Sequence, residues 1–269
     1  MNNTFDFNRF SLLIKRQWVE NKKLFLMASF GIMGIIIVIN SLLMRWEYGY
    51  IDTIPRFSIF LLSFYFGGSV FTNYVFKDLS DKNISTSFLL VPASHFEKFL
   101  TGVLYAFVVF PIVFLTLFYV VDLVFVNVGN SIRESLIEAG RNGGVKNVPL
   151  HSYVFDSKNV RESLGKIIGF WLVIQAFVLM GAAQFEGRSY IKTAFMGFII
   201  LFIMGFIVYL SDKFLLGDTI KEFQNKGYSR ELVKPTKDFY NDIFKVILIY
   251  VLPSILLVIA YFKLKEKQV

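Results

Sequence analysis

The sequence predicts an all-α, polytopic membrane protein with six transmembrane helices. Of its 269 residues, 55% are hydrophobic and 18% are charged, whereas soluble domains average roughly 45–50% apolar and about 25% charged residues. Six uncharged apolar runs approach the ~20 residues that a helix needs to cross about 30 Å of hydrocarbon. Strand-like alternation is absent from the sequence, and backbone in lipid must satisfy its own hydrogen bonds, so the spans are expected to be helices. The runs are Leu24–Met44, Phe57–Phe76, Phe99–Val121, Ile167–Phe185, Thr193–Leu210 and Val246–Phe262.

The segment before the first run, residues 1–23, has the pattern of an amphipathic helix. Apolar residues recur there at steps of three and four, at Phe7, Phe10, Ile14 and Trp18, which favours a helix lying at the membrane interface. The alternative is a basic flank that only sets the topology. The following run is too long for a signal peptide and no A-x-A site follows it, so it is expected to remain as the first helix. The basic residues of the segment are Arg9, Lys15, Arg16, Lys22 and Lys23.

The distribution of charge predicts that both termini lie inside. Taken together, the segments 1–23, 77–98, 186–192 and 263–269 carry 13 basic and 7 acidic residues, an excess of the kind that cytoplasmic segments show. Two longer loops, at about 127–166 and 211–245, are then outside, and neither is large or apolar enough to form a domain. We therefore expect a single membrane domain over residues 24–269.

The first outer loop and the spans contain further local signals. The stretch Ser131–Glu138 has a helical pattern and is followed by the breakers Gly143-Gly144 and Pro149. Within the spans, Gly67-Gly68 would allow close helix approach, and prolines in spans three and six would kink their helices. These prolines are Pro111 and Pro253.

The inner loop between spans two and three contains a helix start. Ser94 followed three residues later by Glu97 is a capping box, which predicts a helix beginning at His95. Pro92 disfavours helical conformation at the residue before it and so separates this start from the preceding segment. The short apolar element at residues 88–90 would either lie against the bilayer or fill a groove on a cytoplasmic partner.

The sequence lacks the common catalytic and metal-binding motifs. It has no cysteine, which excludes disulfides and thiolate chemistry. It contains no P-loop, no H-E-x-x-H and no G-x-S-x-G pattern, and its two histidines, His95 and His151, are predicted on opposite sides of the membrane. The net charge of +8, in so apolar a chain, indicates an anionic bilayer surface rather than nucleic acid as partner.

Two polar residues are candidates for a role within the membrane. Asp122 directly follows the third run, and it is either an intramembrane functional acid or a marker of the water interface. Gln175 lies inside the fourth run, where a polar side chain either joins helices by a hydrogen bond or lines a substrate path.

The stretch Ser85–Leu104, STSFLLVPASHFEKFLTGVL, resembles the cytoplasmic loop of type-2 permeases of bacterial ATP-binding-cassette exporters. In that family a polar stretch leads into apolar residues, then Pro-small-Ser, then the amphipathic start of the third span. Six spans, an interfacial helix before the first, and a short basic tail at residues 263–267 agree with the same layout, and residues 181–193 look like the family's second inner turn. The residues that match the coupling loop are Ser85, Thr86, Phe88, Leu89, Leu90, Pro92, Ser94, Glu97 and Lys98.

The resemblance implies a function for this loop. It would be a short cytoplasmic coupling helix that inserts into a separate P-loop ATPase subunit, which would bind ATP and magnesium, while this chain binds no cofactor and is no enzyme by itself. The chain would pair with a second copy or a paralogue in the bacterial cytoplasmic (inner) membrane. Two alternatives from other classes stay open, a membrane-embedded enzyme acting on lipid or glycan and a non-transporting assembly or sensor component that binds an ATPase.

Overall fold

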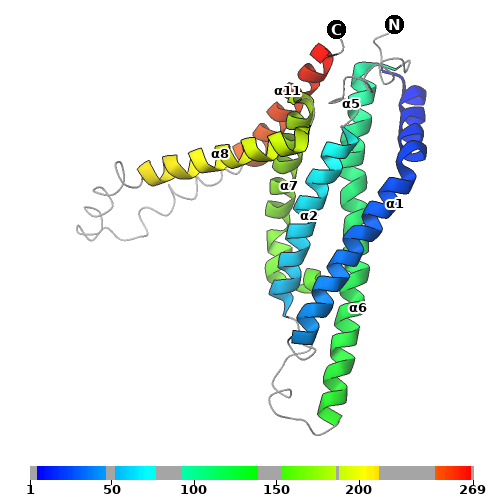
Figure 1. Cartoon of the computed structure of the whole chain (residues 1–269), viewed down its shortest axis with the longest axis vertical. Helices are drawn as coiled ribbons and strands as arrows, with labels where there is room; N and C mark the ends of the chain where they lie inside the picture. The colour runs from blue at the N-terminus through cyan, green and yellow to red at the C-terminus, as the bar shows by residue number, and fades with distance from the viewer. Residues whose placement is uncertain are drawn as a thin grey trace. The chain divides into compact units, whose positions relative to one another are not determined.

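The chain is helical throughout the part that the computed structural model describes, residues 5–46, 52–76, 93–138, 153–185, 188–211 and 246–267. These residues contain no strand, so the predicted all-α class is confirmed for them. The elements, drawn in Figure 1, are α1 (Phe7–Trp46), α2 (Thr53–Val75), α5 (His95–Leu104), the π-helical turn η1 (Tyr105–Val109), α6 (Phe110–Glu138), the 3₁₀ turn η3 (Val154–Asp156), α7 (Lys158–Gln184), α8 (Ser189–Ser211), the π-helical turn η5 (Ile247–Val251) and α11 (Leu252–Lys267).

Four helical stretches among the described residues are long and apolar enough to cross a bilayer, which makes this chain a membrane protein. They cover the first four predicted spans except for the last residue of the second and of the fourth, Phe76 and Phe185. The fifth and sixth predicted spans coincide with α8 and with η5–α11. In the described residues, neither of these elements is among the four stretches that are long and apolar enough to cross a bilayer. The four stretches are Phe7–Met44, Thr53–Val75, His95–Glu138 and Val160–Gln184.

The contacts within the chain divide it into two compact units. The first comprises Met1–Val75 with Leu90–Gln175, and the second comprises Phe76–Leu89 with Ala176–Val269. In the first unit, α1 runs along α6, and α2 packs on both of them (Figure 1).

The N-terminal segment is not a helix separate from the first span. Helix α1 runs without interruption over 40 residues, about 60 Å at 1.5 Å per residue. Of the apolar positions predicted to face the membrane interface, Phe10 is buried against protein, whereas Phe7 is 73% exposed. The change from a polar to an apolar surface after residue 23 therefore does not end the helix.

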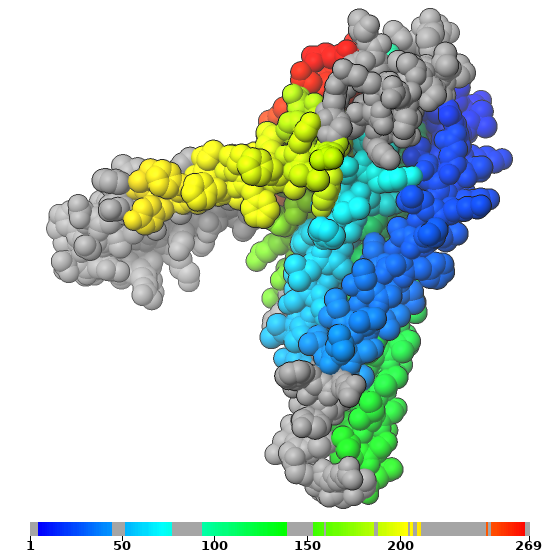
Figure 2. Space-filling view, in the orientation of Figure 1, coloured from blue at the N-terminus to red at the C-terminus, as the bar shows by residue number. Residues whose placement is uncertain are grey.

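The third predicted span is part of a longer helical run. Elements α5, η1 and α6 follow one another without a break from His95 to Glu138, 44 residues in all, which is about 66 Å. Figure 2 shows α6 extending beyond the ends of α1 and α2. The helical pattern predicted at 131–138 is thus the last part of this helix. The segment predicted as an outer loop, at about 127–166, includes the end of α6 at Glu138 and the start of α7 at Lys158.

The two prolines predicted within spans each follow a π-helical turn. Pro111 comes two residues after η1, and Pro253 comes two residues after η5. A proline has no N–H to donate and its ring crowds the carbonyl four residues earlier, and a π turn widens the backbone at that position. The helices adapt to their prolines by this local widening.

Aromatic side chains form the core of the first unit. Phe64 stacks on Trp171 with ring centroids 4.1 Å apart, and Phe60 lies 4.9 Å from Phe118. Gly68 makes room for this packing, because a Cβ atom at residue 68 would lie 2.0 Å from Cη2 of Trp171. The close helix approach predicted at the glycine pair occurs here, between α2 and α7.

A second close approach lies within the second unit. A Cβ atom at Gly181 of α7 would lie 2.1 Å from Oγ1 of Thr193 on α8. That hydroxyl donates a hydrogen bond to the Ser189 carbonyl at 2.7 Å, so its position is fixed. The glycine therefore allows the start of α8 to pack against the end of α7.

Candidate functional site

The helix start predicted at the end of the inner loop is present. Helix α5 begins at His95, Ser94 Oγ accepts a hydrogen bond from the Glu97 N–H at 3.2 Å, and Glu97 Oε2 accepts one from the Ser94 N–H at 2.9 Å. Both partners of the capping box thus satisfy donors that the first turn of a helix leaves unpaired. The loop therefore passes into a helix with a defined first turn.

Glu97 also joins this helix start to the start of α1. Its side chain is fully buried, and its Oε1 accepts hydrogen bonds from the Asp6 N–H at 2.7 Å and from Arg9 Nη2 at 3.1 Å. Asp6 in turn caps α1, since its Oδ1 accepts from the Asn8 N–H at 2.8 Å. One carboxylate therefore connects the first turns of two helices that are 91 residues apart in sequence.

Two tyrosine hydroxyls extend this connection along α1. Tyr105 of η1 donates to the Ile14 carbonyl at 2.8 Å, and Tyr74 of α2 donates to Asn21 Oδ1 at 3.1 Å. Phe25 continues the same face of α1 and is buried against Phe71 and Tyr105. The N-terminal half of α1 is thus attached to α2 and to the α5–η1 segment by both polar and apolar contacts.

The structure describes three of the nine residues predicted in the coupling loop. Ser94 and Glu97 form the junction just described, and Lys98 follows them in the first turns of α5, where it is buried. The other six lie outside the described residues: Ser85, Thr86, Phe88, Leu89, Leu90 and Pro92.

Asp122 belongs to a buried ion pair at the opposite end of the first unit. Its Oδ1 accepts a hydrogen bond from Arg56 Nη1 at 2.6 Å, and the two side chains are 1% and 3% exposed. Its Oδ2 accepts from the Val154 N–H at 2.8 Å, which holds η3 against α6. The carboxylate of Asp122 is therefore paired within the protein. Its two predicted roles, an intramembrane functional acid and a marker of the water interface, stay predictions.

Arg56 was not among the predicted site residues. It directly precedes the second uncharged run, just as Asp122 directly follows the third. In the predicted topology, both residues lie at the outer ends of their spans, at the same level in the membrane. Two opposite charges at one level are the signal in the sequence from which this ion pair could have been predicted.

Gln175 makes the contact expected of a residue that joins helices. It is fully buried on α7, and its Oε1 accepts a hydrogen bond from the Thr72 hydroxyl of α2. The same side chain would be 2.8 Å from a Cβ atom at Gly68. Helices α2 and α7 thus meet through a small residue and a polar pair, the combination that membrane helices use for close packing.

The carboxylates described above bond to donors within the protein, whereas Gln175 Nε2 is buried without a hydrogen-bond partner among the described residues. The described residues contain no group of three or more histidine, cysteine or acidic side chains that could hold a metal ion. Comparison with family models, with curated proteins and with solved structures finds no match for this chain. What the chain can do is therefore inferred from its own residues, above all from the junction at Glu97.

Proposed function

We propose that this chain is the transmembrane permease subunit of an ATP-binding-cassette exporter. It would cross the bacterial inner membrane six times with both termini in the cytoplasm, and would associate with a second copy or a paralogue around a central path. A separate P-loop ATPase subunit would bind ATP and magnesium. The resemblance of residues 85–104 to a coupling loop supports this proposal.

The observation that carries the proposal is the position of Glu97. The loop enters α5 at a fixed first turn, and α5 continues through η1 into α6. Through Glu97 the same turn is bonded to Asp6 and Arg9 at the start of α1. A displacement of the loop would therefore reach two membrane-crossing helices at once, which is the contiguous link that a coupling element requires.

In this mechanism the chain performs no hydrolysis. The apolar residues Phe88, Leu89 and Leu90 would occupy a groove on the ATPase, and closure of the ATPase dimer on binding ATP would move them as a body. The junction at Ser94 and Glu97 would pass this motion into α1 and α6, and so switch the path between inward and outward openings.

The test is to purify the tagged full-length chain from native membranes in a mild detergent and to measure ATP hydrolysis by the subunit that co-purifies. Phe88→Ala and Leu89→Ala are expected to insert normally and to lose at least a few-fold in stimulated hydrolysis. Leu12→Ala is the matched control, because Leu12 is an exposed leucine of α1 outside the loop, and it is expected to hydrolyse ATP like the unsubstituted complex.

Two outcomes would contradict the proposal. If both loop variants recover and stimulate the ATPase like the unsubstituted chain, the loop is not the coupling element. If no P-loop ATPase co-purifies under conditions that preserve oligomers, the chain is not a permease subunit, and an enzyme of lipid or glycan acting alone becomes the better assignment.

A further inference from the structure

A long apolar groove opens between α1 and α2 in the first unit. Its volume is about 700 Å³, within the roughly 300–1,000 Å³ of typical small-molecule sites. Its walls include Phe25 and Ile32 of α1 and Phe66 and Val70 of α2, and Phe110 of α6 lies at its floor. Phe66 is 66% exposed, so the groove presents apolar side chains to its surroundings.

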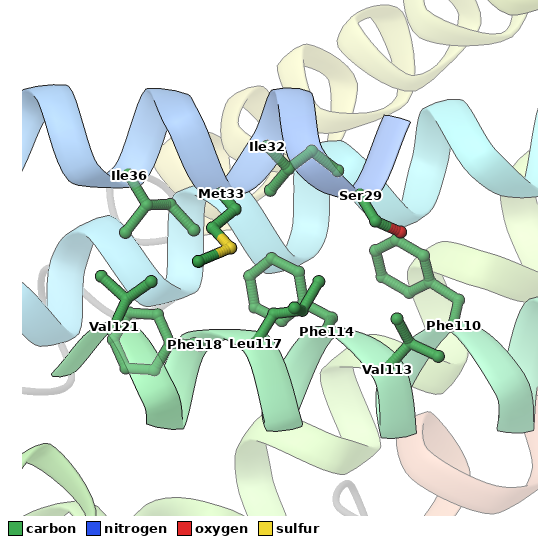
Figure 3. Close-up of a pocket in the computed structure, with 10 residues that line it drawn as sticks. All are labelled: Ser29, Ile32, Met33, Ile36, Phe110, Val113, Phe114, Leu117, Phe118 and Val121. Carbon is green, nitrogen blue, oxygen red and sulfur yellow. The ribbon is translucent and has the colours of Figure 1, made fainter. Parts of the chain in front are cut away.

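The shape of the groove suits an extended chain better than a compact molecule. Its lining on α1 runs from Trp18 to Ile35, about 26 Å at 1.5 Å per residue. Its floor continues into a narrow seam of about 20 Å³ between α1 and α6, where Ser29 of α1 lies opposite Phe110 of α6 (Figure 3). The groove is thus long, shallow and almost entirely hydrocarbon in character.

The end of the groove nearest the N-terminus has a different chemistry. Trp18 and Tyr74 line it there, and the Tyr74 hydroxyl is bonded to Asn21. Residues three and four apart share a helix face, so Lys15 and Lys22 lie on the same side of α1 as Trp18, and both are exposed. Tryptophan, tyrosine and lysine together are typical of the level at which lipid headgroups meet hydrocarbon.

We propose that this groove binds an anionic phospholipid of the surrounding bilayer. One acyl chain lies along the groove from Trp18 towards Ile35, and the headgroup phosphate pairs with Lys15 and Lys22. The positive charge beside one end of an otherwise apolar groove favours this occupant, because the headgroup phosphate of an anionic lipid has no cation of its own, whereas the choline of a zwitterionic lipid offsets the attraction between its phosphate and the lysines. The inference requires a membrane location alone and is independent of the proposed transport function.

Fluorescence quenching of Trp18 tests the site directly. The full-length chain has three tryptophans. Trp46→Phe removes one of them. Trp171 is buried within the protein, so its fluorescence is expected to be the same with either lipid and to form a constant background. The protein is reconstituted in phosphatidylcholine vesicles that contain a minor fraction of phosphatidylglycerol brominated in its acyl chains. We expect quenching several-fold stronger than with the same fraction of brominated phosphatidylcholine.

Two pairs of variants locate the lipid. Gly31 lines the groove and a Cβ there would meet no atom within 4 Å, so the first side-chain atom of Gly31→Phe has room. The bulky ring placed at the groove is expected to abolish the preferential quenching. Gly34→Phe, which is equally open at its Cβ and lies outside the lining, is its control. The double substitution Lys15→Gln with Lys22→Gln is expected to make the quenching by the two brominated lipids equal. Lys23→Gln, on the opposite side of α1, is expected to keep the stronger quenching by the anionic lipid.

Three results would overturn the proposal. Equal quenching by both brominated lipids in the unsubstituted groove excludes selection of the anionic headgroup. If the anionic lipid still quenches the Gly31→Phe variant as preferentially as the unsubstituted chain, the lipid does not lie in this groove. Weak quenching by both lipids means that Trp18 is shielded, as it would be if a second copy of the chain occupied the groove.

Discussion

Replacing Asp122 by asparagine is expected to lower the free energy of unfolding by about 3 kcal/mol. The substitution leaves the guanidinium of Arg56, 3% exposed, without its carboxylate partner, and breaking a buried ion pair in this way costs about 3–5 kcal/mol. The lower end of that range applies, because the asparagine oxygen can still accept the hydrogen bond from the Val154 N–H.

The double substitution Arg56→Leu with Asp122→Asn distinguishes an ion pair from two independent contacts. Arg56→Leu alone leaves a buried carboxylate and is expected to cost a similar ~3 kcal/mol. The double variant contains neither buried charge, so it is expected to be more stable than either single variant. If the two sites were independent, the two losses in the free energy of unfolding would instead add to about 6 kcal/mol in the double variant.

Unfolding by sodium dodecyl sulfate in mixed micelles, followed by the fluorescence of Trp171 in the core, measures these differences. Glu162→Gln serves as the control, because Glu162 forms a 3.8 Å ion pair with Lys158 in which the side chains are 66% and 84% exposed. Such a surface pair contributes about 0–1 kcal/mol. The reasoning is refuted if the two buried single variants behave like Glu162→Gln, or if their effects add in the double variant.

Two further predictions concern helix packing and helix starts. Gly181→Ala is expected to destabilise the chain by about 1–3 kcal/mol, because the new Cβ would lie 2.1 Å from Oγ1 of Thr193. Gly165→Ala on the same helix is its control. A Cβ at Gly165 meets no atom within 4 Å, so this substitution is expected to stabilise the chain by about 0.5–1 kcal/mol. Detergent unfolding checks both, and shifts of the same sign would be inconsistent with the packing. Ser94→Ala removes one capping bond and is expected to cost about 1 kcal/mol. Glu97→Gln is expected to cost more in the same titration, since the carboxylate accepts from Ser94, Asp6 and Arg9, and an equal loss would mean that the link to α1 adds nothing.

Local features of the fold were predictable from the sequence because their causes lie within a few residues. The capping box needs only Ser94 and Glu97, and both of its hydrogen bonds are present. The first four uncharged runs coincide with helices because length and composition alone decide whether a segment can cross hydrocarbon. No helix end accompanies the predicted segment limit at residue 23, since a helix continues through a change of surface polarity as long as its backbone hydrogen bonds are kept.

Features that depend on distant partners were not predictable in the same way. The sequence places Arg56 and Asp122 beside apolar runs, but only the packing of α2 on α6 brings them to 2.6 Å. The second role of Glu97 is harder still to foresee, because one of its donors is the backbone N–H of Asp6, and a backbone donor has no signature in the amino-acid sequence. Gln175 lies between these cases, since a hydrogen bond between helices was one of its two predicted roles, but its partner Thr72 was not specified.

The positions of the two polar junctions explain how buried charges are tolerated in so apolar a unit. Glu97 and Asp122 lie on one helical run, separated by about 38 Å at 1.5 Å per residue, which exceeds the roughly 30 Å thickness of bilayer hydrocarbon. Each junction can therefore stand near a different boundary, while the apolar contacts between them cross the lipid. Because both ends of the run are bonded to neighbouring elements, a bend in the run is expected between the two junctions. The π turn at Tyr105–Val109 lies in that interval, directly ahead of a proline that removes one backbone hydrogen bond, so this is the place where the run can bend at least cost.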